Sequence, residues 1–433
     1  MSSLLKQRGQ PNIVVLVIDC GRWDRFSTYG HYRPTTPNID RLASQGLVFE
    51  QAYSVDTATP LSHFALMSGQ QDWNGRAWLN GATIIEKTSF LIRRAMRRLG
   101  LTDYVAGFDE KRHSLIGLLR EAGYFTLGVS ANHLVSPKTM QAYSGFEKFP
   151  EEELNDGLFE DPQIAKRLKQ YKVEDSKANR QAVYLTADRV LSTARNSLVQ
   201  HNPNFERPFF LFANLMDCHD PYLVHDDVKD DFGFKPNSDF NSDLRNRKLP
   251  AKQTNGEAYR WTDSEDLDPQ TVDLLRWNYD RCLNYIDQQL GALWAFLEEQ
   301  GQAEETVFIV TADHGEQLGE NGFFTHSQQA TEYQTHIPMI LSGSKYMLEG
   351  QRITNLASLV DIRPSILDLL GIDDPFEHRS GQSLFGKREN ESSIGLNGPR
   401  NKEQALFGSE RDEVSEAELA VLEERLRDLG YLD

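Results

Sequence analysis

Five short apolar runs recur along the chain, and none shows the polar alternation of a half-exposed strand. They cover residues 13–18, 125–130, 208–216, 306–312 and 337–342. Continuous apolar runs of this length are typical of parallel strands that are buried on both faces of a sheet. We therefore predict that all five runs are parallel strands of one buried sheet.

Helical patterns lie between these runs, and several of them stop directly before a glycine. Glycine often follows the last helical residue, because it adopts the left-handed conformation that ends a helix. The glycines are Gly46, Gly123, Gly301 and Gly371. Strands that alternate with helices predict an α/β fold, in which helices cover both faces of a central sheet.

Polar side chains follow the first four apolar runs, at the point where each run ends. They are Asp19 after the first run, Asn132 and His133 after the second, Asp217 and His219 after the third, and Asp313 and His314 after the fourth. Ligands of open α/β sheets bind at the carboxyl ends of the strands. We predict a single site at these ends, provided that the four strands are parallel neighbours. The alternative is that Asp and Asn merely begin turns.

A further helix is predicted to begin at the pair Thr59–Pro60 and to end at Gly69. Because proline suits the first helical position, we expect Thr59 to be the N-cap, and capping alone would explain a threonine there. A helix N-terminus also attracts anions, and a metal ion can turn a hydroxyl beside it into a nucleophile. Ser62 is the rival hydroxyl, but it lies inside the helix.

The predicted metal ligands are Asp19, Thr59, Asp313 and His314. The pair Asp313–His314 lies at a strand end, where a tight turn into Gly315 would aim both side chains at one ion. Three oxygens and one nitrogen suit Mn, Mg, Ca or Zn better than a soft metal.

The charge of the chain is strongly acidic, since 46 Lys and Arg against 64 Asp and Glu give a net charge of −18. An acidic surface repels polyanions, so nucleic acid is not an expected partner. The cysteines Cys20, Cys218 and Cys282 are far apart, which argues against a disulfide framework. No apolar stretch has the length of a signal peptide or a membrane span, so we expect a cytoplasmic protein.

Several longer motifs resemble the sulfatase-like branch of the alkaline phosphatase superfamily. They include NIVVLVIDCGRWDRFSTYGHYRPTTPNIDRLASQGLVFEQAYS, TPLSHFALMSG, NLMDCHDPY, VFIVTADHGEQLGENG, LVDIRPSILDLLGI and the closing RLRDLGYL. The resemblance spans most of residues 12–386. It implies a large mixed, mostly parallel central sheet sandwiched by helices, one or two metal ions, and hydrolysis or transfer of sulfate or phosphate esters.

The length of 433 residues suits one large domain with a smaller C-terminal addition. We assign residues 10–386 to a sulfatase-like catalytic domain with insertions at 70–110 and 225–270. Residues 387–433 form a short C-terminal region that ends in a helix. Many sulfatases carry a four-stranded subdomain there, so this region is expected to be a reduced form of it.

The chain departs from the sulfatase pattern at its most diagnostic position. Thr59 stands where sulfatases carry the cysteine that becomes formylglycine, and threonine cannot yield that aldehyde. The Pro and Arg positions of the same motif hold Leu61 and His63. Cys20 replaces a second metal-binding aspartate, and His314 stands where many sulfatases have asparagine. These two changes favour a transition metal such as Mn over calcium.

The resemblance also assigns roles around the metal. His326, 12 residues after His314, falls where relatives place a leaving-group Lys or His, and its alternative is a solvent-exposed loop histidine. His219 falls at a substrate-contacting position, and its alternative is a turn residue. We expect substrate contacts from His63, Asn132 and Asp217, and a second metal at Asp217, His219 and His326 is left open.

We therefore predict a metal-dependent hydrolase or transferase of phosphoric esters, with Thr59 as nucleophile and His326 and His219 as further catalytic residues. Phosphodiesters or phosphonate monoesters are the expected substrates, as small-molecule, lipid or glycan esters. One alternative is a sulfuric ester hydrolase with unmodified Thr59. The other is a scaffold that keeps the fold and has lost turnover.

A basic cluster stands out in this acidic chain. It consists of Arg93, Arg94, Arg97 and Arg98, on a stretch with a plausible apolar helical face. It predicts contact with an anionic surface, a phosphate-rich substrate or an acidic partner. The alternative is an amphipathic helix with a solvated basic face. We also expect a homo-oligomer.

Overall fold

The computed structural model describes residues 4–70, 114–157, 164–166, 185–220, 222, 269–320, 323–326, 330–375 and 380–386. Several predictions lie outside these residues. They are the arginine cluster, all but the first residue of the insertion at 70–110, all but the last two residues of the insertion at 225–270, and the C-terminal region at 387–433.

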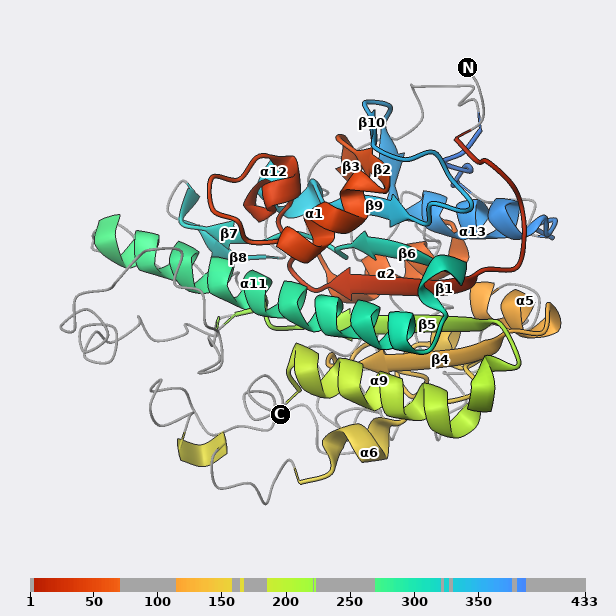
Figure 1. Ribbon diagram of the computed structural model, residues 1–433. Coiled ribbons are helices and arrows are strands. Elements are labelled where there is room, and N and C mark those ends of the chain that lie inside the picture. The colour runs from red at the N-terminus through yellow and green to blue at the C-terminus, as the bar shows by residue number, and fades with distance from the viewer. Residues whose placement is uncertain are drawn as a thin grey trace, which may run out of the picture. The chain divides into compact units, whose positions relative to one another are not determined.

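The described residues form a central seven-stranded sheet (Figure 1). From one edge to the other, its strands are β10 (Gln351–Ile353), β2 (Gly46–Phe49), β9 (Met339–Ser342), β6 (Thr306–Thr311), β1 (Asn12–Ile18), β5 (Phe209–Leu215) and β4 (Phe125–Ser130). Strand β1 pairs in parallel with both β5 and β6, and β5 pairs in parallel with β4. The prediction that the first four apolar runs are parallel neighbours is confirmed.

The fifth apolar run, β9, lies antiparallel to both of its neighbours, so the prediction of a parallel strand is wrong there. Leu341 of β9 pairs with Ile309 on one side and with Leu47 on the other, and all three are buried. An apolar run indicates that a strand is buried on both faces of a sheet. It does not indicate the direction of the strand, because parallel and antiparallel strands can be buried equally. The sheet is thus mixed and mostly parallel, as the resemblance implied.

Helices cover both faces of this sheet. One face carries α1 (Pro37–Ser44), α9 (Ala187–His201) and α11 (Pro269–Glu299), and the other carries α2 (Thr59–Ser68), α5 (Leu115–Glu121) and α13 (Ile362–Leu370). Alternate side chains of β1 point to opposite faces and enter two separate cores. The predicted α/β architecture with two covered faces is confirmed.

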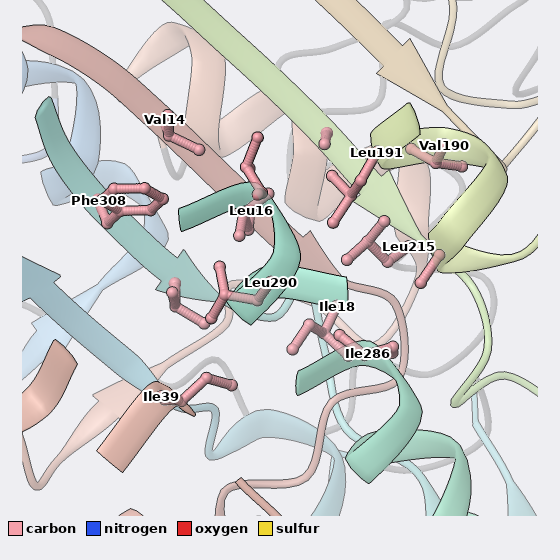
Figure 2. Close-up of a cluster of buried hydrophobic side chains, with 14 of the residues drawn as sticks. Val14, Leu16, Ile18, Ile39, Val190, Leu191, Leu215, Ile286, Leu290 and Phe308 are labelled. Atoms are coloured by element: carbon pink, nitrogen blue, oxygen red, sulfur yellow. The ribbon is translucent and has the colours of Figure 1, made fainter. Parts of the chain in front are cut away.

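Figure 2 shows the core under α1, α9 and α11. Leu16 of β1 is buried there together with Ile39 of α1, Leu191 of α9 and Leu290 of α11. Each such side chain contributes about 1.5–3 kcal/mol relative to an exposed one. This packing fixes the position of β1, and with it the position of Asp19 at the end of the strand.

Shorter elements complete the described fold. They are the strands β3 (Ala52–Tyr53), β7 (Gln317–Leu318), β8 (Phe324–Thr325) and β11 (Ala357–Ser358), and the helices α6 (Glu151–Asn155) and α12 (Glu332–Thr335). Strand β7 pairs with β8, which brings the segment before His326 back beside the segment after His314. Among the described residues, no helix is both long and apolar enough to cross a membrane.

Three of the four predicted glycine stops follow their helices in the left-handed conformation. Their φ angles are +89° at Gly123, +67° at Gly301 and +67° at Gly371. Gly46 is different, because it is the first residue of β2, and its prediction as a helix stop is wrong. A Cβ at Gly46 would collide with the backbone of Leu341 in β9, so close strand approach requires glycine there.

Candidate active site

The carboxyl ends of the four parallel strands bring the predicted polar residues together. Asp19 follows β1, and its backbone N–H donates to the Leu215 carbonyl at the end of β5 at 2.9 Å. Asn132 follows β4, and its side-chain amide donates to Asp19 Oδ2 at 2.8 Å. Asp313 follows β6, and its Oδ1 accepts from the backbone N–H of Cys20 at 3.3 Å. The strand ends therefore converge on one buried group of side chains.

Thr59 reaches this group from the start of α2. The prediction that it caps the helix is wrong, because Ala58 is at the N-cap position and no side chain caps the end. Thr59 is already helical and Pro60 is the second helical residue. Its Oγ1 lies 3.3 Å from His314 Nε2 instead. Since the hydroxyl is not used for capping, it is available to chemistry at the strand ends.

Ser62, the rival hydroxyl, is bound elsewhere. Its Oγ lies 2.9 Å from Ser54 Oγ and donates to the Asp56 carbonyl at 3.2 Å. Ser62 is fully buried and faces the loop before α2. These bonds favour Thr59 over Ser62 as the reactive hydroxyl.

The tautomer of His314 follows from its hydrogen bonds. Its Nδ1 donates to the Gly315 carbonyl at 2.9 Å, which leaves Nε2 with a lone pair. Nε2 lies 3.3 Å from Thr59 Oγ1 and 3.4 Å from Asp313 Oδ2. Burial, followed by the charge of His326, lowers the pKa of His314 to about 3, so this imidazole is neutral at ordinary pH. A neutral imidazole with a fixed lone pair is a ready metal ligand.

Asp313 supplies the test of whether a cation fits these residues. Its Oδ1 accepts from the backbone N–H groups of Cys20 and His314, but its fully buried Oδ2 has no hydrogen-bond partner. Burial and the nearby Asp19 carboxylate raise the pKa of Asp313 well above its usual range. An unpartnered buried carboxylate oxygen is costly, and a divalent cation would remove that cost. Asp19, Thr59, Asp313 and His314 therefore fit a divalent metal ion.

The second carboxylate of the group, Asp19, is held by two amides. Asn132 donates to Asp19 Oδ2 at 2.8 Å, and Asn214 approaches the same oxygen at 3.5 Å. Burial alone would raise the pKa of Asp19, but His219, His314 and the Asn132 bond outweigh burial and lower it. Asn132 was predicted to bind substrate, and that role stays a prediction. Asn214 is absent from the sequence predictions, although a lone amide in the run FFLFANL is a signal for it.

His63 lies beneath the site and is fully buried. Its Nδ1 is 2.7 Å from the Tyr143 hydroxyl, and its Nε2 is 3.3 Å from Asn214 Nδ2 and 3.7 Å from Asp313 Oδ2. Burial lowers the pKa of His63 to about 4, so it is neutral. Its predicted contact with the transferred group stays a prediction.

His326 and His219 form the more exposed side of the site. The His326 ring centroid lies 4.5 Å from that of His314 and 5.0 Å from that of His219. His326 Nδ1 lies 3.2 Å from Glu316 Oε1. Burial would lower the pKa of His326, but the Glu316 charge and hydrogen bond raise it to about 9. Its side chain is 16% exposed and ion-paired, which rules out the solvent-exposed loop histidine.

Glu316 and Asp217 anchor the loops that follow β6 and β5. Glu316, the last residue of the motif D-H-G-E, is fully buried and was missed by the sequence predictions. Asp217 Oδ2 accepts from the backbone N–H of Ala187, the first residue of α9, at 3.0 Å. A role of Asp217 in substrate binding stays a prediction. His133 is exposed.

Comparisons with known proteins agree with this arrangement. The profile of the family described as Sulfatase matches residues 11–372. An N-acetylglucosamine-6-O-sulfatase of Bacteroides thetaiotaomicron is 24% identical over 88% of this chain and 71% of its own length. The multifunctional alkaline phosphatase superfamily protein PehA of Trinickia caryophylli is 23% identical over 78% of this chain and 69% of its own length.

A solved structure shares the fold. The phosphonate monoester hydrolase of Agrobacterium radiobacter aligns with a TM-score of 0.59 at 18% identity, over 88% of this chain and 76% of that one. Similarity at this level of identity establishes the common fold only.

Proposed function

Because the chain belongs to the sulfatase family and is a hydrolase of sulfate or phosphate esters, we propose that it hydrolyses phosphoric esters with Thr59 as its nucleophile. Phosphodiesters and phosphonate monoesters are the proposed substrates. The observation that carries the proposal is the position of Thr59 Oγ1. This hydroxyl does not cap α2, and it lies 3.3 Å from His314 Nε2, the ring nitrogen that carries the lone pair.

The chemistry of threonine favours phosphorus over sulfur as the atom attacked. Formylglycine hydrate releases sulfate when its second hydroxyl helps the geminal diol to collapse. Thr59 has one hydroxyl, so an ester formed on it must be opened by water at the central atom. Phosphothreonine can be opened in this way.

A divalent cation is part of the proposal, and Mn²⁺ is the first choice, with Zn²⁺, Mg²⁺ and Ca²⁺ as alternatives. Asp19, Thr59, Asp313 and His314 would hold it. When bound, such an ion lowers the pKa of the Thr59 hydroxyl and neutralises charge on the transferred group.

Three residues of the site have separate roles in the proposed reaction. Thr59 Oγ1 gives its proton to solvent and attacks phosphorus in line, and the bond from phosphorus to the leaving oxygen breaks. His326, whose pKa of about 9 keeps it protonated at neutral pH, gives its proton to that oxygen. His219 lies beside His326 and contacts the same side of the substrate. Water then attacks the phosphothreonine, Thr59 regains its proton, and His326 is reprotonated from solvent.

Two other functions use the same fold. A sulfuric ester hydrolase with unmodified Thr59 is favoured by the sulfatase relatives. A transferase would use an acceptor alcohol in place of the water that attacks the intermediate. An inactive scaffold is disfavoured, because Asp19, Asp313 and His314 converge around an unpartnered oxygen that a scaffold need not keep.

The experiment is a comparison of three chromogenic esters with Mn²⁺ present. Bis-p-nitrophenyl phosphate tests phosphodiesters, p-nitrophenyl phosphate tests phosphomonoesters and p-nitrophenyl sulfate tests sulfate esters. The expected result is the highest kcat/KM on the phosphodiester, with loss of turnover in Thr59→Ala. Highest kcat/KM on the sulfate supports the sulfuric ester hydrolase. Full activity of Thr59→Ala would refute the nucleophile.

A further inference from the structure

His63 is the middle member of a buried chain of contacts that runs beneath the site. Its Nδ1 is 2.7 Å from the Tyr143 hydroxyl, and its Nε2 is 3.3 Å from Asn214 Nδ2. Asn214 Nδ2 lies in turn 3.5 Å from Asp19 Oδ2. His63, Tyr143 and Asn214 are all fully buried. Both ring nitrogens of His63 therefore have partners within the protein.

We propose that His63 is a positioning residue, which fixes the start of α2 relative to the strand ends and so aims Thr59 at the cation site. The inference deepens the proposed function, on which it rests for the roles of Thr59 and the cation. It replaces the substrate contact that the sequence predicts for His63, because both polar atoms of the ring are already used.

The geometry of α2 links His63 to the nucleophile. Thr59 and His63 lie four residues apart on this helix, so their side chains point from the same face. From this face Thr59 Oγ1 reaches His314 Nε2 at 3.3 Å, one turn nearer the N-terminus. A rotation of α2 about its axis would move both side chains together. Contacts that hold the His63 ring therefore also set the direction of the Thr59 hydroxyl.

The His63 ring is held by aromatic neighbours as well as by hydrogen bonds. Its centroid lies 5.7 Å from that of Phe212 on β5, with the ring planes 80° apart, and 6.0 Å from that of Tyr143. Tyr143 and Phe212 contact each other edge to face at 5.1 Å. Edge-to-face contacts at these distances are favourable between aromatic rings. Packing and hydrogen bonding thus fix the same ring plane.

The hydrogen-bond pattern assigns the tautomer of His63. Asn214 Nδ2 faces the Asp19 carboxylate, which can only accept, so the amide nitrogen and not the amide oxygen must lie on that side. The same nitrogen then donates its other hydrogen to His63 Nε2. Nδ1 therefore carries the ring proton and donates to the Tyr143 oxygen.

This tautomer explains why Asp313 keeps an unpartnered oxygen. Asp313 Oδ2 lies 3.7 Å from His63 Nε2, but a nitrogen that accepts from Asn214 cannot donate to this oxygen. The opposite tautomer would turn an N–H toward Oδ2 and compete with a cation for it. His63 thus leaves Oδ2 available to the cation while it orients Asn214 beside Asp19.

Two substitutions separate the roles of the two ring nitrogens. The side-chain oxygen of glutamine can replace Nε2 and accept from Asn214, whereas the shorter asparagine reaches only the position of Nδ1 beside Tyr143. Because residues that orient metal ligands typically contribute this much, His63→Asn should weaken Mn²⁺ binding by about 10–100-fold and lower kcat, with KM unchanged. His63→Gln should keep most of the Mn²⁺ affinity and of kcat.

The measurements are made on the full-length protein. Mn²⁺ affinity is measured by calorimetry after treatment with a chelator, so this reading does not depend on turnover. The kinetic constants kcat and KM are measured on whichever chromogenic ester wild type hydrolyses best. Circular dichroism checks that each variant is folded.

Tyr143→Phe tests the chain from its far end, and it carries the test if His63→Asn does not fold. Tyr143 is not one of the four predicted metal ligands, but its oxygen is the acceptor for His63 Nδ1. Its loss should lower Mn²⁺ affinity and kcat at unchanged KM, by less than His63→Asn does. Adding Tyr143→Phe to His63→Asn should cause little further loss, because both act through the same ring.

Phe64→Leu is the matched control, because Phe64 is the next residue of α2, is equally buried in the core and is not part of the chain of contacts. It should keep the Mn²⁺ affinity, kcat and KM of wild type. Wild-type Mn²⁺ affinity in both His63→Asn and Tyr143→Phe would overturn the proposal. A rise in KM alone in His63→Asn would also overturn it, since His63 would then contact the substrate.

Equal losses in His63→Gln and His63→Asn would overturn the proposal as well, because the acceptor at Nε2 would then have no role. Failure of the proposed function gives different readings. Full activity of Thr59→Ala would refute the nucleophile and leave the order of the Mn²⁺ affinities unchanged. Absence of Mn²⁺ binding by wild type would overturn both proposals.

Discussion

The Thr59 hydroxyl faces groups that can only accept a proton. His314 Nε2 has a lone pair because Nδ1 donates to the Gly315 carbonyl, and the buried Oδ2 of Asp313 has no partner. A helix-capping threonine would instead accept from the backbone N–H groups of its own helix. At the scale of single residues, the site is therefore defined by one hydroxyl that does not cap its helix and one carboxylate oxygen that is unsatisfied.

His326 gives a prediction at the same scale, which is that its removal matters most for poor leaving groups. His326→Gln should lower kcat by about 10²–10⁴-fold on an alkyl phosphodiester, because the departing alkoxide needs a proton. On a p-nitrophenyl ester the loss should be much smaller, because nitrophenolate is stable without one. The measurement is kcat for both esters in wild type and variant. An equal loss on both would contradict a role of His326 at the leaving oxygen.

Much of the residue set could be read from the sequence, and the misses have a physical cause. Asp19, Asp313 and His314 are recognisable because they end apolar runs. Asn214 and Glu316 were missed, since their importance comes from what they contact: Asn214 approaches Asp19, and Glu316 pairs with His326. The lone amide in the run FFLFANL marks Asn214 as unusual, but a local pattern does not show which distant residue it contacts.

At the scale of elements, parallel strands explain why the site lies where it does. Val17 of β1 pairs with Asn214 of β5 and with Thr311 of β6, so these strands end at the same level. The sequence predicted these strands but not the direction of β9, because burial on both faces carries no directional information. The start of α2 was also misplaced by one residue, which decided whether Thr59 caps the helix or faces the site.

Helix α1 depends on a cap from another element, which gives a stability prediction. The carboxylate of Asp287 on α11 accepts from the backbone N–H groups of Asn38 and Ile39 at 3.0 and 2.8 Å. Asp287→Ala leaves these buried donors without a partner and should lower the free energy of unfolding by about 1–2 kcal/mol. Asp287→Asn keeps one acceptor and should lose less. Urea unfolding of the three proteins measures the difference, and equal stability of Asp287→Ala and wild type would contradict it.

The same carboxylate predicts a pH effect. Burial raises the pKa of Asp287 from 3.8 to about 6, although the hydrogen bonds from Asn38 and Ile39 act in the opposite direction. The folded state therefore binds this proton more tightly than the unfolded state, so the linked stability is full below about pH 4 and is lost as the pH rises through about 6. Asp287→Asn cannot titrate. The stability of wild type relative to Asp287→Asn should increase from pH 7.5 to pH 5, and a constant difference would contradict the raised pKa.

At the scale of the whole molecule, the buried carboxylates make stability depend on the cation. A ligand that binds only the folded protein adds about 2.7 kcal/mol at 100 times its Kd. Chelator should therefore lower Tm of wild type, and Mn²⁺ should restore it. In chelator, Asp313→Asn should be more stable than wild type, because it removes a buried charge whose Oδ2 has no partner. If Asp313→Asn is less stable than wild type without metal, Asp313 has a structural role and the cation site is wrong.

The family and the sheet architecture followed from motifs that span most of the chain, and both are confirmed. The substrate did not follow, because the relatives include both a sulfatase and a phosphonate monoester hydrolase. Under the proposed function, the single hydroxyl of Thr59 is expected to favour phosphorus over sulfur.

The most direct test of the central claim is the chemical identity of the covalent intermediate. The enzyme is mixed with bis-p-nitrophenyl phosphate and Mn²⁺, quenched in acid during turnover, digested and analysed by mass spectrometry. The account predicts a peptide that carries a p-nitrophenylphosphoryl group on Thr59, absent from Thr59→Ala. The same group on Ser62 or on a histidine, or turnover of Thr59→Ala at the wild-type rate, would contradict it.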